Sequence, residues 1–177
     1  SMPIGLWGDQ DNRLMQATYY GMYPQVWNHG DWATENDTGG FIIHGRSDAT
    51  LNRQGVRIGT AEIYNSLNTR ENLKDSLVIH LTNDKQDSLL LFVVAQLEVD
   101  EKEIRAQLRE QCSPRHVPDY IICVPDIPYT LSGKKVEIPI KRLLMGVSQS
   151  DALSKDSLRN PDSIKWFVDY AKTNPST

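Results

Sequence analysis

The chain has 177 residues, of which 39% are hydrophobic and 24% charged, and its net charge at pH 7 is −4. This suffices for one modest core, and the acidic balance removes the electrostatic case for binding nucleic acid or an anionic membrane surface. The longest apolar run, residues 89–95, is too short to span a bilayer. With no visible signal peptide and two cysteines that lack metal-ligand spacing, the sequence predicts a cytoplasmic protein.

Residues 1–47 are predicted to form short strands separated by turns. The turn-forming run 36–40 and the apolar run 41–44 predict a β-hairpin. Because this region is too short to close a core alone, we expect it to belong to a larger sheet or barrel. Asp31 follows Gly30 at the expected end of a strand, where its two oxygens can bind a vicinal diol. An ordinary turn aspartate is the alternative.

The polar stretch 44–64 reads HGRSDATLNRQGVRIGTAEIY. Its glycines, among them Gly55, allow close backbone approaches that a Cβ would forbid. Arg46 and Arg57 offer forked donors that suit phosphate oxygens or sugar hydroxyls. Gly59 and Thr60 indicate a turn followed by the start of a helix. From composition alone, a solvated surface turn explains the same residues equally well.

The next segment is predicted to form a helix and two strands. Spacing of apolar residues indicates a helix over 61–67, and strands are expected over 77–81 and 88–99 with a turn between them. The second strand is apolar almost throughout, which is typical of a central strand covered on both faces. Asp100 and Glu103 have capping-box spacing and predict a helix with Ile104, Leu108 and Cys112 on its buried face.

Further along, the pattern predicts a third strand over 120–124 and a helix from about Pro139 to about Met145, with Gly146 just beyond its end. The tail 147–160 is polar and predicted to be mobile, and an amphipathic helix follows Pro161. The predicted fold class is therefore α+β, a small three-stranded sheet with flanking helices.

Two motifs resemble the adenylate-forming superfamily, which includes acyl-CoA synthetases. The stretch 44–64 resembles its hinge motif, and PYTLSGK at residues 128–134 resembles its C-terminal catalytic loop, Pro-x-x-x-Ser-Gly-Lys. The resemblance implies that residues 1–47 are the β-rich end of a large N-terminal adenylation domain. Residues 48–146 would be the mobile C-terminal domain after a hinge at Asp48, and residues 147–177 a polar linker and a last helix.

The resemblance also implies two half-reactions. A carboxylate reacts with ATP and Mg²⁺ to give an acyl-adenylate and pyrophosphate, the small domain rotates, and the thiol of CoA then attacks the adenylate. Because the first step brings two anions together, a cation delivered on a loop would lower their repulsion. The roles carried over are catalysis for Lys134, nucleotide binding for Asp31, Arg46 and Arg57, and CoA binding for Gly55 and Arg109.

Some of these matches are partial. The family element at the ribose is Thr-Gly-Asp, whereas this chain has His29-Gly30-Asp31. Lys135 has no claim from the motif, and without the hinge motif a solvated lysine pair on a turn would be the better interpretation. For Arg109, a solvated helix arginine is an equally good one.

Departures from the superfamily pattern narrow the choice of branch and, with it, of the acid substrate. Ala49 replaces the usual second aspartate, and Asn52 with residues 59–63 resembles the branch that contains acetyl-CoA synthetases. Together with the stretches 1–7, 23–32, 113–117 and 128–141, they most resemble ligases whose substrates are acetoacetate, ATP and CoA. The same domain from a ligase for another short-chain acid, such as acetate, is the alternative. The phosphate-binding loop and the acyl pocket of the N-terminal domain are not visible, so we expect a C-terminal part that is inactive without the missing N-terminal domain.

Two other classes of function are alternatives to a ligase. A non-catalytic binding or regulatory module could keep the small-domain fold, but retention of Lys134, Arg57 and Asp31 together argues against it, since none is needed for folding. A metal site is not expected, because the spacings of the four histidines match no ligand pattern. These histidines are His29, His44, His80 and His116.

Overall fold

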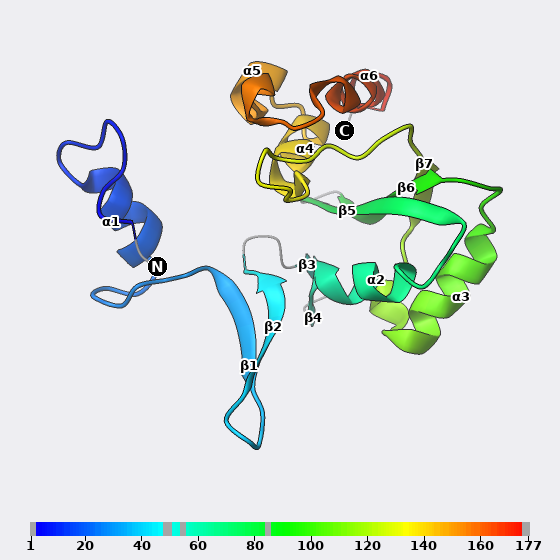
Figure 1. The fold of residues 1–177 in the computed structure, drawn as a ribbon, viewed down its shortest axis with the longest axis horizontal. Helices are drawn as coiled ribbons and strands as arrows, with labels where there is room; N and C mark the ends of the chain where they lie inside the picture. Colours follow the sequence, from blue (N-terminus) through cyan, green and yellow to red (C-terminus); the bar gives the residue numbers. More distant parts are fainter. Residues whose placement is uncertain (1–2, 48–50, 54–55, 84–85, 175–177) are drawn as a thin grey trace. The chain divides into compact units, whose positions relative to one another are not determined.

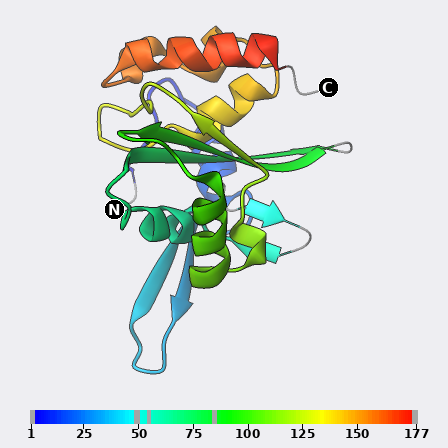
Figure 2. The same cartoon turned by 90° about the vertical axis from the view of Figure 1, so that its right-hand side faces the viewer.

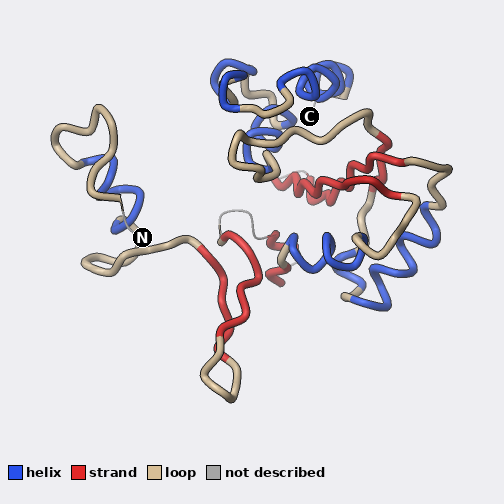
Figure 3. Tube along the Cα trace, viewed as in Figure 1, coloured by secondary structure: helices blue, strands red, loops and turns tan. Residues whose placement is uncertain are grey.

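The computed structural model describes residues 3–47, 51–53, 56–83 and 86–174. The chain divides into two compact units, residues 1–48 and 49–177. Figure 1 shows the elements of both units, and Figure 3 distinguishes their helices from their strands. No helix in the described ranges is long and apolar enough to cross a membrane.

The first unit contains α1 (Arg13–Tyr20) and the antiparallel strands β1 (Asp31–Glu35) and β2 (Phe41–Arg46). The predicted hairpin is thereby confirmed. The prediction of only strands and turns is wrong for α1, whose first turn is held by the Asp9 carboxylate, which accepts from the backbone N–H groups of Leu14 and Met15 at 3.0 and 2.8 Å. None of the described side chains of this unit is fully buried.

The second unit opens with the hairpin β3 (Leu51–Arg53) and β4 (Val56–Ile58) and the helix α2 (Thr60–Leu67). A three-stranded sheet follows, in the order β5 (Leu73–Asn83), β6 (Gln86–Ala95) and β7 (Tyr120–Cys123). β6 lies in the centre, antiparallel to β5 and parallel to β7. The α+β fold predicted from the sequence is confirmed.

Helices cover both faces of this sheet, as Figure 2 shows: α2 and α3 (Glu101–Gln111) on one face, α4 (Glu137–Leu144) and α6 (Ile164–Thr173) on the other. Alternation along β6 explains this, because successive side chains point to opposite faces of a strand. Leu89, Leu91 and Val93 join one buried cluster, and Leu90 and Phe92 join the other. β6 is thus the doubly covered central strand that its sequence predicts.

The helix-start signals are also confirmed. The Asp100 side chain accepts from the backbone N–H groups of Lys102 and Glu103 at the start of α3, and Ile104 and Leu108 are fully buried. A single turn, η1 (Pro114–His116), joins α3 to β7.

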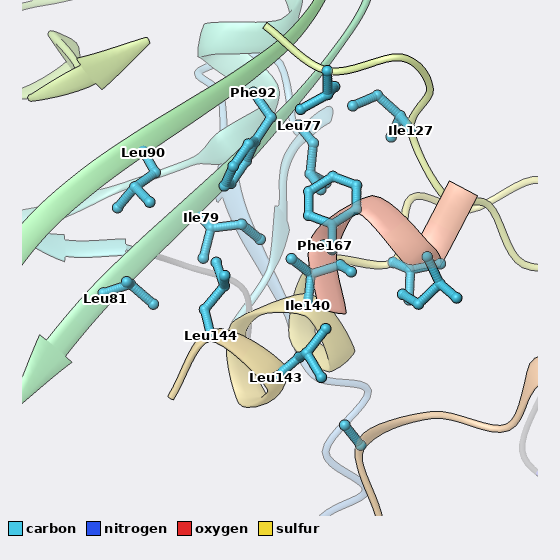
Figure 4. Packing of buried hydrophobic residues seen from close by; sticks show 14 of the residues in the cluster. Leu77, Ile79, Leu81, Leu90, Phe92, Ile127, Ile140, Leu143, Leu144 and Phe167 are labelled. Carbon is cyan, nitrogen blue, oxygen red and sulfur yellow. The ribbon is translucent and has the colours of Figure 1, made fainter. Parts of the chain in front are cut away.

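The tail after α4 differs from the prediction. Residues 147–163 carry the short helix α5 (Gln149–Ala152) and the single turns η2 (Lys155–Ser157) and η3 (Pro161–Ser163). Ala152 and Leu158 are buried in the cluster on the α4 face, together with Ile164 and Phe167 of α6. Figure 4 shows Phe167 beside Phe92 and Ile140 in this cluster. Most of the residues around these buried positions are polar, which is why the sequence suggests a mobile segment.

Candidate functional site

The loop that carries Lys134 is a tight turn between two paired residues. Tyr129 and Lys135 form an antiparallel bridge, and the N–H of Thr130 donates to the carbonyl of Lys134 at 2.9 Å. The N–H of Lys134 donates to the Thr130 hydroxyl at 3.0 Å. Gly133 has a φ of +80°, a conformation that favours glycine. The Ser-Gly-Lys motif therefore has a local structural reason for its glycine.

The structure distinguishes the two neighbouring lysines. Lys135 places its ammonium 2.8 Å from the Asp75 carboxylate, donates to the carbonyl of Ser76 and lies 4.1 Å from the centre of the Tyr64 ring. The three N–H donors of that ammonium are thus engaged. Lys134 is exposed and has no ion-pair partner in the part of the chain that the structure describes. Lys134 is the lysine available to an anionic ligand.

Two tyrosine hydroxyls act as neutral hydrogen-bond donors at the stem of this loop, which is formed by Tyr129 and Lys135. The Tyr64 hydroxyl donates to Glu137 at 2.6 Å and accepts from the N–H of Val78 at 3.0 Å. Burial, followed by the charge of Glu137, raises the pKa of Tyr64 well above its usual value. The Tyr129 hydroxyl donates to Asp75 at 2.6 Å, and burial and that hydrogen bond raise the pKa of Tyr129. Both hydroxyls keep their protons at neutral pH.

The tail braces the same loop from its outer side. The Asn160 amide oxygen accepts from the N–H of Tyr129 at 2.9 Å, and the N–H of Arg159 donates to the carbonyl of Tyr129 at 2.9 Å. Leu158 forms a bridge with Thr130. The Asn160 side chain also donates to Asp126 and to the carbonyl of Ile127. Hydrogen bonds therefore join the loop of residues 129–135 to residues 157–160 of the tail.

Two predicted nucleotide-binding residues lie opposite one another in the first unit. Asp31 begins β1, and Arg46, at the end of β2, is its partner in the strand register. The Asp31 carboxylate contacts the Nδ1 atom of His29, whose ring meets the edge of Trp27 at 5.1 Å between centroids. The side chain of Arg46 lies outside the described part of the structure.

The remaining predicted residues either lie on separate elements of the second unit or fall outside the residues that the structure describes. Arg57 lies in β4, but its side chain is not described, and Gly55 and the hinge residue Asp48 lie outside the described residues. Arg109 is exposed in the last turn of α3. That helix covers the opposite face of the sheet from α4, into which the Lys134 loop leads, so the structure does not bring these two cations together (Figure 2).

Comparison with known proteins identifies relatives of nearly the whole chain. It is 41% identical, over 95% of its length, to an acetoacetyl-coenzyme A synthetase of Rhizobium meliloti and 41% identical, over 96%, to an acetoacetyl-CoA synthetase of Caenorhabditis elegans. A solved acetoacetyl-CoA synthetase from Streptomyces lividans matches 97% of the chain with a TM-score of 0.89 and 39% identity. The chain is homologous to the C-terminal part of acetoacetyl-CoA synthetases.

The match covers only part of each relative. The chain spans about a quarter of the acetoacetyl-CoA synthetases it matches: 26% of the Rhizobium protein, 25% of the Caenorhabditis protein and 26% of the Streptomyces chain. A malonamoyl-CoA synthetase of Penicillium aethiopicum is 39% identical over 90% of the chain, which is 23% of that protein. No family model matches the chain. Relatives of similar identity are thus named for two different acids.

A solved amide bond synthetase of Marinactinospora thermotolerans has the same fold at 18% identity and a TM-score of 0.62, over 78% of this chain and 28% of that one.

Asp75, which contacts the base of the Lys134 loop, is a residue that the sequence did not single out. Asp75 is spaced by two residues from Leu77 and by four from Ile79, so it belongs to the same face of β5 as these two residues, which are buried in the cluster on the α4 side. A carboxylate in step with buried leucine and isoleucine is a signal, because acidic residues are rarely buried unless paired.

Arg53 is a second residue that the sequence reasoning missed. Its guanidinium donates to the carbonyls of Arg115 and Val117 at 3.2 and 2.6 Å and to the Asp119 carboxylate at 2.6 Å. Asp119 in turn accepts from the N–H of Leu89 at 2.7 Å. These bonds tie the β3–β4 hairpin, in which Arg57 lies, to the start of β7.

Replacing Arg53 by alanine is expected to lower the free energy of unfolding by about 1–3 kcal/mol, because it removes one donor from the Asp119 carboxylate and one from each of two carbonyls. Urea denaturation of the chain measures this. In a double-mutant cycle, Asp119→Asn should add less to the loss in the Arg53→Ala background than in the original chain. The exposed neighbour Arg115→Ala, expected to change stability by less than about 0.5 kcal/mol, is the control. Fully additive losses would contradict the coupling.

Proposed function

We propose that this chain is the C-terminal part of a cytoplasmic ATP-dependent acid–thiol ligase. The ligase activates acetoacetate as an acyl-adenylate and transfers it to CoA, which gives acetoacetyl-CoA, AMP and pyrophosphate. The observation that carries the proposal is the exposed Lys134 in a braced turn, in a chain homologous to acetoacetyl-CoA synthetases.

In the first half-reaction, a carboxylate oxygen of the acid attacks the α-phosphorus of ATP, and the bond to the pyrophosphate oxygen breaks. Negative charge gathers on the non-bridging oxygens in the transition state. The Lys134 ammonium, which has no competing ion pair among the described residues, would stabilise that charge and align the two anions. Lys135 cannot share this role while Asp75, Ser76 and Tyr64 engage its ammonium.

The other residues have supporting roles in this proposal. Asp31 and Arg46, opposite one another in the β1–β2 hairpin, would bind the ribose hydroxyls of the nucleotide. Arg57 would contact the phosphate, Gly55 would allow the pantetheine arm of CoA to pass, and Arg109 would bind a CoA phosphate. His29 contacts Asp31 in the structure, so it would orient that carboxylate toward the diol.

Mg²⁺ would arrive with ATP. Among the residues that the structure describes, no group of three or more histidine, cysteine, aspartate or glutamate side chains could hold a metal ion.

The second half-reaction requires the small domain to turn about a hinge at Asp48. Leu51 and Ile58 are buried in the second unit, and Arg53 ties their hairpin to residues 115–119. The β3–β4 hairpin would therefore travel with the C-terminal unit and bring Arg57 to the adenylate. The division of the chain after residue 48 supports this placement of the hinge.

Two alternatives make different predictions. The acid could be another short-chain carboxylate such as acetate, since relatives of similar identity are named for different acids. A non-catalytic module could instead keep the fold alone. The exposure of Lys134 argues against the latter, because a lysine without an ion-pair partner in the described chain contributes little to folding.

The proposal is tested by acid-dependent exchange of pyrophosphate into ATP. A protein restored to the length of its relatives should exchange with acetoacetate faster than with acetate, whereas the 177-residue chain should show no exchange. Apolar side chains of the first unit, such as Phe41, Ile42 and Ile43, are 68%, 53% and 59% exposed, which fits a unit that packs against further chain. Exchange by the chain alone, or none by the restored protein, would contradict the proposal.

A further inference from the structure

One carboxylate contacts both ends of the loop that carries Lys134. The Oδ2 atom of Asp75 accepts from the Tyr129 hydroxyl at 2.6 Å, and its Oδ1 atom lies 2.8 Å from the Lys135 ammonium. Tyr129 and Lys135 are themselves bridge partners and flank residues 130–134. Asp75 belongs to β5 and lies 54 residues before Tyr129 in the chain. A residue of the sheet thus joins the two stems of the loop.

This arrangement is sheltered from water. The side chains of Asp75 and Lys135 are only 19% and 21% exposed, so solvent screens their attraction less than it would at the surface. The other two donors of the Lys135 ammonium meet the carbonyl of Ser76 and the face of the Tyr64 ring. Hydrogen bonds to a charged partner are shorter and stronger than neutral ones. Lys135, at the base of the loop, is therefore anchored by an ion pair, a hydrogen bond and a ring contact, whereas the turn beyond it is exposed.

The turn itself is held by its own hydrogen bonds and, on the side of Tyr129, by the tail. Within it, Thr130 bonds to Ser132, Gly133 and Lys134, and the N–H of Leu131 donates to the carbonyl of Ser157. The side chain of Leu131, at the tip, is 68% exposed. The tail holds the Tyr129 side through Asn160 and Ser157, whereas Lys135 is held by Asp75 and its neighbours. Where the Lys134 ammonium is presented therefore depends on how the Lys135 stem is anchored.

We propose that Asp75 is a positioning residue for adenylation, which clamps Tyr129 and Lys135 together and so fixes the position of Lys134. This inference rests on the proposed function, because it assigns Lys134 to the phosphate. Asp75 itself would touch neither the substrates nor the reacting atoms. Displacement of a catalytic group by about 1 Å can cost about 100-fold in rate.

The first test uses the enzyme restored to the length of its relatives. Asp75→Asn preserves the size of the side chain and removes its charge, and it should lower kcat for adenylation about 10- to 100-fold. KM for ATP and thioester formation from preformed adenylate should be unchanged. In the Lys134→Ala background, Asp75→Asn should cause no further loss, because its effect passes through Lys134. Equal adenylation by Asp75→Asn and the original enzyme, or losses that multiply, would overturn the clamp.

The second test uses the 177-residue chain and does not depend on catalysis. Asp75→Asn should raise the hydrogen-exchange rates of the amides of residues 130–134 by about tenfold. The milder variant Tyr129→Phe should raise them less, and it keeps the test open if Asp75→Asn does not fold. Glu103→Gln removes a carboxylate of α3 that is paired with Arg70; it is the matched control and should leave these amides unchanged. Unchanged exchange in both loop variants would contradict the clamp.

The two proposals fail in different ways. If Lys134→Ala adenylates like the original enzyme, the proposed function is wrong, whatever the exchange data show. If Lys134→Ala is impaired but Asp75→Asn is not, the proposed function stands and the positioning role of Asp75 is wrong.

Discussion

Replacing Lys134 by alanine in the protein restored to the length of its relatives is expected to lower acyl-adenylate formation by about 10²–10³-fold. This is the usual loss when one donor that stabilises transition-state charge is removed from an enzyme. Lys134 is exposed and unpaired within the described chain, so its removal should not alter folding. A single-turnover experiment that monitors adenylate formation through the release of pyrophosphate measures the effect directly.

The second half-reaction serves as the internal control for this variant. Thioester formation from preformed adenylate and CoA should survive in Lys134→Ala, because the lysine acts only while the α-phosphorus is attacked. Lys165→Ala, which removes an exposed lysine of α6, should leave both steps unchanged. A Lys134→Ala protein that loses both half-reactions equally would point to a structural defect. A protein that retains adenylation would exclude the proposed role.

Local signals in the sequence were sufficient for most of the second unit. The start of α3 follows from Asp100 and Glu103, and the burial of β6 follows from its unbroken apolar run, since each depends on neighbours in the chain. The position of Lys134 beyond a glycine with positive φ is likewise a local property. α1 was missed because Asp9, which caps it, lies five residues before the first N–H that it accepts from, within a run that resembles a turn.

The support of the Lys134 loop could not be predicted in the same way. Asp75 and Tyr129 are 54 residues apart, and Asn160 lies 31 residues after Tyr129. No periodicity or spacing relates them, because their contacts arise only when β5, the loop and the tail pack together. The motif therefore located the lysine, whereas its anchors required the structure. All the assigned roles stay predictions: catalysis for Lys134, the hinge at Asp48, and ligand binding for Asp31, Arg46, Arg57, Gly55 and Arg109.

Aromatic packing holds α6 on the sheet, with Phe167 at its centre. Phe167 of α6 is fully buried, and its ring meets the edge of Phe92 from the central strand at 5.1 Å and that of Trp166 at 5.2 Å. Phe167 shares its buried cluster with Leu158, which pairs with Thr130 in the Lys134 loop. The packing of α6 on the sheet is thus linked to the loop through residues 157–160.

Replacing Phe167 by alanine is expected to lower the free energy of unfolding of the second unit by about 3–5 kcal/mol. The loss combines the burial of the ring with the cavity left behind it, and it is a large part of the 5–15 kcal/mol typical of a domain. Urea denaturation followed by circular dichroism measures it. Phe41→Ala, at a phenylalanine that is 68% exposed, should change stability by less than about 0.5 kcal/mol.

The same variant separates the packing of the tail from its brace on the loop. Under conditions where Phe167→Ala is still folded, the amides of Tyr129 and Leu131, which donate to Asn160 and Ser157, should exchange faster than in the original chain. The amides of α3, on the opposite face of the sheet, should change less. A stability loss below about 1 kcal/mol would show that α6 contributes little to the core. A large loss with unchanged exchange at Tyr129 and Leu131 would show that the loop holds its shape without the tail.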